Sequence, residues 1–271
     1  MTDPLSLVAL GAAVGGATGR FVEKAYDSGQ KWIAAYFASH NPKAIEKAQE
    51  NSADFLNQLA DRIKILEEQK AASQEQIETA QDHPGFSVTL QKALLTAAQT
   101  DSHQKHMLLA RILADRLAAP PEGLRAMASK MACDSIGYMT PNQLKLLGLN
   151  AELVHIRPPQ QFSTRDYSIW IESRFSKYLD VHFTTLDLLH LESLSCLKYI
   201  PGFVRDLNQI LTQKNNGDCD PKLFESPRVL HVKGLWDQGL NAVDLTSVGQ
   251  VIGVYVSDLL TGTNTAFKGW D

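Results

Sequence analysis

Two histidines on one predicted helix are the side chains whose spacing best suits metal chemistry. His103 and His106 are three residues apart at the start of a helical segment, so both can face one side of the helix. Asp101 or Asp115 is available as a third ligand. Zinc sites normally use three or four well-defined ligands, and no spaced cysteine or Glu–His partner accompanies this pair. We therefore interpret the histidines as exposed or capping side chains and predict no metal ion and no cofactor.

The sequence offers no other pattern of catalytic chemistry. Its cysteines, Cys133, Cys196 and Cys219, are odd in number and lack metal-site spacing, which is typical of reduced thiols in a cytosolic protein. Cys219 lies between two aspartates, which oppose the ionisation that a reactive thiol requires. No serine elbow, kinase motif set or zinc-hydrolase motif is present. We predict that the protein is not an enzyme and has no catalytic residues.

Composition and charge are those of an ordinary globular protein. The 271 residues are enough for one large domain or two smaller ones. With 26 basic and 30 acidic residues, the net charge of −4 argues against a general nucleic-acid coat but leaves room for a local basic face. The amino terminus lacks a basic segment, so we predict no signal peptide and a cytoplasmic location.

Three glycines at four-residue intervals mark the amino-terminal stretch Leu5–Gly19. On a helix, Gly11, Gly15 and Gly19 line one face, where another helix can approach closely, as in membrane helix dimers. The stretch falls short of the roughly 20 residues that cross a bilayer. Three hypotheses stay open: a helix packed on the protein or on another copy, a membrane contact or insertion, and a disordered end. The membrane hypothesis would place the protein at the periphery of the inner membrane.

Aromatic side chains follow this stretch. Phe21, Trp32 and Tyr36 alternate with Lys24 and Lys31, and such an amphipathic segment suits either a membrane interface or a protein core. The predicted membrane or oligomer contact comprises Gly11, Gly15, Gly19, Phe21, Trp32 and Tyr36.

A long charged helix is expected over residues 42–81. Pro42 is a start signal, and an apolar stripe runs from Ile45 through Phe55 to Leu66 before the sequence becomes polar. One half is expected to pack, and the other to project into solvent or to pair with another chain. A helix this long is well above the globular mean, which favours an oligomer role over a surface helix of a monomer.

Residues 83–150 are expected to form a compact set of antiparallel helices. Asp101 matches the N-cap of a capping box, and a proline pair beginning at Pro120 ends the helix that follows. Two further signals are a helix start at Thr140 and a C-terminal cap at Gly148.

The run from Lys92 to Leu149, which contains ALLTAAQT, LLARIL and MTPNQL, resembles the central region of bacterial Abi-alpha-like proteins. That family is poorly characterised and is linked to phage defence. The resemblance covers residues 84–149. It implies a helical protein of bacterial antiviral defence, of the abortive-infection kind, with no catalytic residues to carry over.

The carboxy-terminal part is expected to be helical and to end in a winged-helix-like subdomain. Helices are expected over residues 164–179, 184–200 and 203–214, a recognition helix at 228–234, a small β-hairpin within 235–242 and a further helix from residue 245. Arg228, His231 and Lys233 are the candidate contacts to DNA or to a partner protein. DNA is the less favoured ligand, because phosphate neutralisation normally needs more basic contacts.

These patterns predict a mainly α fold: a multi-helix bundle with a long amino-terminal helix and a carboxy-terminal winged-helix-like subdomain with a small β-hairpin. The expected parts are residues 1–40, 41–82, 83–150 and 151–271. The leading hypothesis is a non-enzymatic anti-phage defence protein, a sensor or effector acting through homo-oligomerisation and membrane contact, with a partner protein from the same defence system. The alternative is a cytosolic winged-helix adaptor or regulator that binds a partner protein or DNA. A toxin-like enzyme whose site follows no known motif is the third hypothesis.

Overall fold

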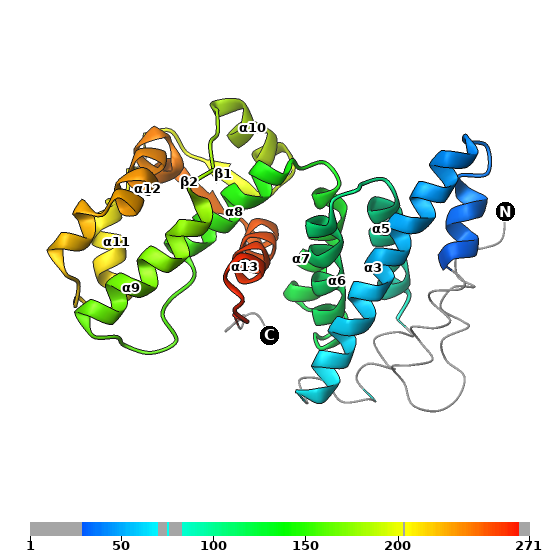
Figure 1. The fold of residues 1–271 in the computed structure, drawn as a ribbon, viewed down its shortest axis with the longest axis horizontal. Coiled ribbons are helices and arrows are strands. Elements are labelled where there is room, and N and C mark those ends of the chain that lie inside the picture. The colour runs from blue at the N-terminus through cyan, green and yellow to red at the C-terminus, as the bar shows by residue number, and fades with distance from the viewer. Residues whose placement is uncertain (1–28, 70–74, 76–82, 203, 266–271) are drawn as a thin grey trace. The chain divides into compact units, whose positions relative to one another are not determined.

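The protein is mainly helical, as expected. The computed structural model describes residues 29–69, 75, 83–202 and 204–265 (Figure 1). The chain divides into two compact units, unit 1 ending at Tyr138 and unit 2 beginning at Met139. None of the helices in the described ranges combines the length and the hydropathy that a bilayer crossing requires.

Unit 1 is a bundle in which a long helix crosses shorter ones. Its helices are a short segment at residues 29–36, α3 (Pro42–Glu68), α5 (Pro84–Ala98), α6 (His103–Leu117) and α7 (Leu124–Ile136). α3 packs on α5 and α6, and α7 packs on the same two helices (Figure 1). Residues 70–74 and 76–82 lie outside the described part, so the second half of the expected long helix stays a prediction.

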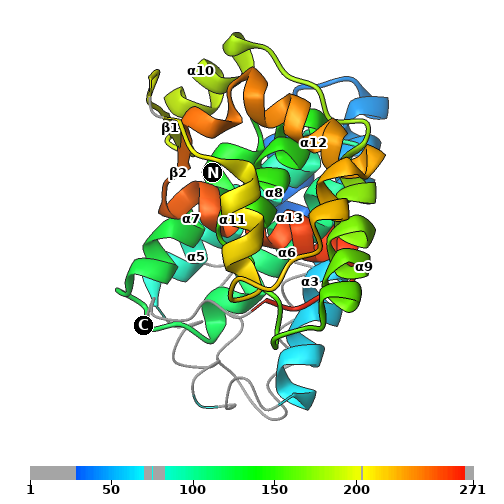
Figure 2. The same cartoon turned by 90° about the vertical axis from the view of Figure 1, so that its left-hand side faces the viewer.

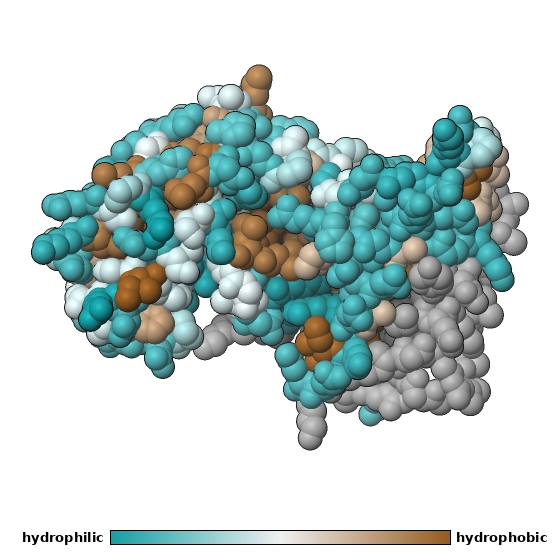
Figure 3. Space-filling view, viewed as in Figure 1, coloured by the Kyte–Doolittle hydropathy of each residue, from teal (hydrophilic) through white to brown (hydrophobic). Residues whose placement is uncertain are grey.

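The amphipathic pattern of α3 is confirmed. Phe55, Leu59 and Ile63 lie on its buried face, as their four-residue spacing requires. The opposite face carries exposed side chains such as Asp61 and Lys64, and the side of α3 that Figure 3 presents is hydrophilic. The apolar stripe therefore positions α3 against the rest of unit 1.

The cap of α6 differs from expectation, and α7 packs in an unusual way. Ser102, not Asp101, is the N-cap of α6, and its hydroxyl accepts a hydrogen bond from the backbone N–H of Lys105. The aspartate instead accepts a hydrogen bond from Asn51 of α3 at 2.9 Å. On α7 the large apolar side chains Leu124 and Met131 are exposed, because the helix packs through its small residues.

Unit 2 is built around the helix pair α8 (Pro141–Val154) and α13 (Ser247–Thr261). The helix start expected at Thr140 is confirmed, and the structure adds a full capping box there. The other elements are α9 (Thr164–Phe175), η1 (Ser176–Tyr178), α10 (Thr185–Ser193), β1 (Leu197–Tyr199), α11 (Leu207–Lys214), η2 (Pro221–Glu225), α12 (Pro227–Gln238), η3 (Leu240–Ala242) and β2 (Val243–Leu245). In Figure 2, α9, α11 and α12 lie in front of α8 and α13.

The small sheet of unit 2 joins segments far apart in the sequence. β1 and β2 are antiparallel, with Leu197 opposite Leu245. The helix expected over residues 184–200 therefore ends early, and Ser195 turns the chain into β1 with a φ of 59°. The prediction of a hairpin within residues 235–242 is wrong, because α12 continues to Gln238 and η3 follows it.

Glycines allow the close approach of α13 to its neighbours. A Cβ at Gly253 would lie 2.5 Å from the carbonyl oxygen of Leu147 on α8, so only glycine fits there. A Cβ at Gly249 would lie 1.7 Å from the carbonyl oxygen of Cys196. The C-terminal cap expected at Gly148 is wrong, because this residue lies inside α8.

We expect Gly253→Ala to lower the free energy of unfolding of unit 2 by about 1–3 kcal/mol, since the added methyl group must push α8 and α13 apart. The matched control is Gly234→Ala on α12, where an added Cβ meets nothing within 4 Å. That change should stabilise by up to about 1 kcal/mol, because alanine is the better helix former. Urea unfolding of both variants measures the difference, and equal effects would contradict the close approach.

Candidate functional site

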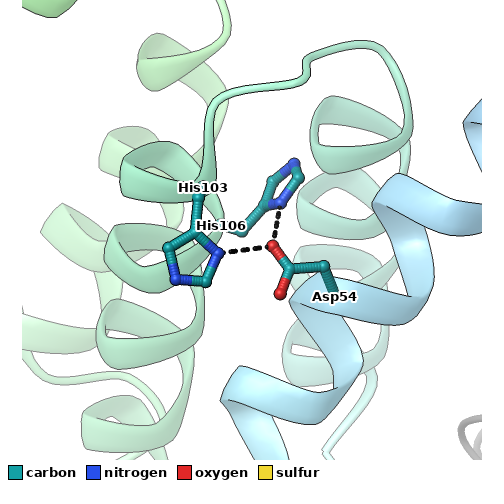
Figure 4. Close-up of side chains that lie close together, drawn as sticks. All are labelled: Asp54, His103 and His106. Atoms are coloured by element: carbon teal, nitrogen blue, oxygen red, sulfur yellow. Dashed lines mark hydrogen bonds and ion pairs between the residues drawn. The ribbon is translucent and has the colours of Figure 1, made fainter.

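The histidine pair lies at the contact between two helices of unit 1. Asp54 projects from α3, and His103 and His106 come from the first turn of α6 (Figure 4). The packing of α3 on α6 brings the carboxylate between the two rings, although the sequence separates them by 49 and 52 residues.

One carboxylate oxygen of Asp54 contacts both histidine rings. The Nδ1 atoms of His103 and His106 each lie 2.7 Å from the same Oδ2 of Asp54. Burial raises the pKa of Asp54, but the hydrogen bonds from His106 and His103 outweigh it, and the pKa lies below its ordinary value. Asp54 is therefore ionised at neutral pH.

The ring of His106 is surrounded by hydrogen-bond acceptors. Its Nε2 lies 3.1 Å from the carbonyl oxygen of Ala97 and 2.9 Å from that of Thr100. Since a carbonyl only accepts, Nε2 donates to both of these oxygens. Hydrogen-bond partners therefore hold both nitrogens of the ring, with Nδ1 facing the carboxylate of Asp54.

Burial distinguishes the two histidines. The side chain of His103 is 60% exposed, as expected, whereas that of His106 is 2% exposed. The interpretation of both as exposed or capping side chains is therefore wrong for His106. Neither aspartate considered from the sequence is the third partner. Asp101 bonds to Asn51, and Asp115 lies 3.9 Å from Arg111 on the same helix.

A second polar cluster is buried inside unit 2. Arg174 of α9 binds Glu152 of α8 with two parallel contacts, Nε to Oε2 at 2.7 Å and an Nη atom to Oε1 at 2.6 Å. Ser257 of α13 donates to the same carboxylate and accepts from Arg174. Lys214 of α11 donates to the carbonyl oxygens of Glu152 and Ile156. Breaking such a buried pair typically costs about 3–5 kcal/mol, so this cluster holds α8, α9 and α13 together.

The remaining site residues expected from the sequence fall in three places. Gly11, Gly15, Gly19 and Phe21 lie outside the described residues. The other two residues of the predicted membrane contact are on the segment 29–36, where the rings of Trp32 and Tyr36 lie 5.6 Å apart.

The third set lies on α12. There Arg228 pairs with Glu172 at 3.3 Å and Lys233 pairs with Asp237 at 2.9 Å, so acidic neighbours balance both cations. His231, the other residue of this set, is partly buried on the same helix.

Comparison with known proteins gives a family but no activity. A family model described as ":-like" matches residues 19–220, about three quarters of the chain, and the protein belongs to this family. That description states no activity, ligand or partner, and it gives no link to Abi-alpha-like proteins. No curated protein and no solved structure matches the chain.

We expect the stability of unit 2 to rise between pH 7 and about 8.5. Complete burial lowers the pKa of Lys214 to about 7. In the unfolded chain this lysine keeps its proton throughout the window, since its ordinary pKa is about 10.4. In this pH range the unfolded state therefore binds more protons than the folded state. The free energy of unfolding rises with pH as a result, by at most about 1.4 kcal/mol per pH unit.

Urea unfolding at several pH values measures this slope. Lys214→Met should flatten it, and the matched change at the exposed Lys177, Lys177→Met, should leave it unchanged. An equal slope in wild type and Lys214→Met would show that another group causes the dependence.

Proposed function

We propose that this family member is a non-enzymatic contact protein that acts by self-association and by binding a membrane surface through the aromatic residues before α3. The observation that carries the proposal is an aromatic patch formed by Trp32, Tyr36, Phe37 and His40. Successive ring centroids in this patch are 5.6, 5.1 and 5.0 Å apart.

The patch is held outward by a firmly anchored helix. Ile33, on the other face of the segment 29–36, is completely buried, and Gly29 lies against Leu56 and Leu94. Gln30 donates hydrogen bonds to the carbonyl oxygen of Gln49 and to the hydroxyl of Ser52 on α3. These contacts support a fixed presentation of the aromatic rings.

The chemistry of the patch favours a membrane interface. Tyr36 is 51% exposed, and Trp32 and Phe37 are partly exposed. Lys31 and Lys43 flank these residues in the sequence, and both lysines are exposed. Aromatic rings with polar edges and flanking lysines suit the boundary between lipid headgroups and acyl chains. Self-association would strengthen such a contact by presenting several patches together.

The role in phage defence is the further part of this proposal. It rests on the resemblance of residues 84–149 to Abi-alpha-like proteins. A sensor or effector that assembles at the inner membrane, with a partner protein from the same defence system, fits both the patch and that resemblance.

Flotation with anionic liposomes tests the membrane contact. We expect Trp32→Ser with Tyr36→Ser to reduce liposome binding about tenfold. Without the two rings, binding loses on the order of 1–2 kcal/mol that comes from their transfer into the membrane interface. The same double variant should lower the protection of expressing cells in plaque assays. Unchanged flotation of the variant would overturn the proposal for the patch.

Two controls accompany the flotation assay. Leu124→Ser with Met131→Ser removes two other exposed apolar side chains of unit 1 and should float as the wild type does. A chain lacking Met1–Arg20 tests the glycine-spaced stretch separately. If only this truncation abolishes flotation, the membrane contact lies in that stretch.

The order of elements in unit 2 favours one alternative, a winged-helix-like adaptor. Helix α10, strand β1, helices α11 and α12, and strand β2 follow one another, and the two strands pair. The exposed Leu230 and the balanced charges of Arg228 and Lys233 favour a partner protein over DNA as its ligand.

We expect no salt-sensitive retention of the full chain on double-stranded DNA above about 0.1 M salt, because acidic neighbours already neutralise the cations of α12. Chromatography on immobilised DNA measures this. Retention that Arg228→Ala with Lys233→Ala abolishes would instead establish the DNA-binding alternative.

A further inference from the structure

We infer that Asp54, His103 and His106 form a binding site for one divalent transition-metal ion, with zinc as the representative. Each side chain offers one ligand atom, and these atoms all lie within 4.8 Å of one another. The three side chains come from two packed helices and point toward a common centre (Figure 4).

The donor set suits zinc and its neighbours in the first transition row. Two imidazole nitrogens and one carboxylate oxygen are ligands that zinc, cobalt and nickel accept, whereas magnesium and calcium prefer oxygen alone. Three protein ligands leave a further position, which faces solvent beside the exposed His103.

The two short contacts with Asp54 require a small adjustment that the site can make. In a tetrahedral site with bonds of about 2.0–2.1 Å, ligand atoms lie about 3.3 Å apart. The two contacts of 2.7 Å must therefore widen by about half an ångström. Asp54 and His103, with side chains 34% and 60% exposed, are free to move by this amount. The buried His106 stays in place.

The second observation is the environment of His106 outside the cluster. Its Nε2 donates to the carbonyl oxygens of Ala97 and Thr100, which leaves Nδ1 as the ligand atom and aims it at Asp54 and His103. Histidines that bind metals characteristically donate their second ring N–H to a carbonyl or carboxylate in this way. The last turn of α5 and the loop that follows it therefore supply the outer hydrogen bonds of a metal site.

The ion would replace the direct contacts that now bridge the cluster. The Nδ1 atoms of both histidines face Asp54, and a metal ion bound by them requires that these nitrogens carry no hydrogen. Because the ligands come from α3 and α6, the bound ion links these helices and should raise the thermal stability of unit 1.

The experiment is a titration of the full chain, freed of metal by a chelator, with Zn²⁺ followed by calorimetry. We expect one ion per chain and an increase in Tm. With Co²⁺ as the probe, visible absorption bands of a tetrahedral site should appear. His103→Gln should weaken the affinity at least tenfold, and Asp54→Asn should do the same. His106 is left unchanged, because its buried ring is part of the fold.

His182→Gln is the matched control, since this exposed histidine belongs to unit 2, where its ring lies 3.1 Å from the carbonyl oxygen of Asp180 and outside the cluster. It should bind zinc as the wild type does, and the circular dichroism of all variants should match. Absence of binding by the wild type would overturn the inference. So would binding by His103→Gln and Asp54→Asn with unchanged affinity, which would place the ion elsewhere.

Discussion

A buried polar or charged side chain needs a partner, and each unit of this protein is arranged around that constraint. In unit 1 the pair is the buried ring of His106 with Asp54, and in unit 2 it is Arg174 with Glu152. Removing either partner of the Arg174–Glu152 pair would leave an unbalanced charge away from water, at a cost of several kcal/mol. Each pair joins different helices, so the helix contacts and the charge pairing require each other.

Helix α3 connects the two functional features of unit 1. Ser52 accepts the hydrogen bond that anchors the helix carrying the aromatic patch, and Asp54 binds the two histidines of α6. In the same turn, Asn51 donates hydrogen bonds to Asp101 and to the carbonyl oxygen of Ala98. One turn of α3 therefore joins the patch, the loop after α5 and the histidine cluster. A change of charge at the cluster acts on the same turn that holds the patch.

Much of the helical architecture could be predicted because its signals are local. The proline start of α3, the capping box at Thr140 and the proline pair after α6 each act within a few residues. The failures have tertiary causes. Asp101 fits the sequence pattern of an N-cap. In the structure its side chain accepts a hydrogen bond from Asn51, and Ser102 caps the helix instead. The expected hairpin was lost because β2 pairs with β1 rather than with a neighbouring segment.

The sequence by itself determined the mainly helical class, the amphipathic face of α3 and the placement of His103 and His106 on one helix face, since these follow from periodicity and spacing. Only the tertiary structure decided that Asp54 is their third partner and that His106 is buried. A residue about fifty positions away carries no local sign of such a contact. The packing of α3 on α6 creates it, and with it the chemistry of the site.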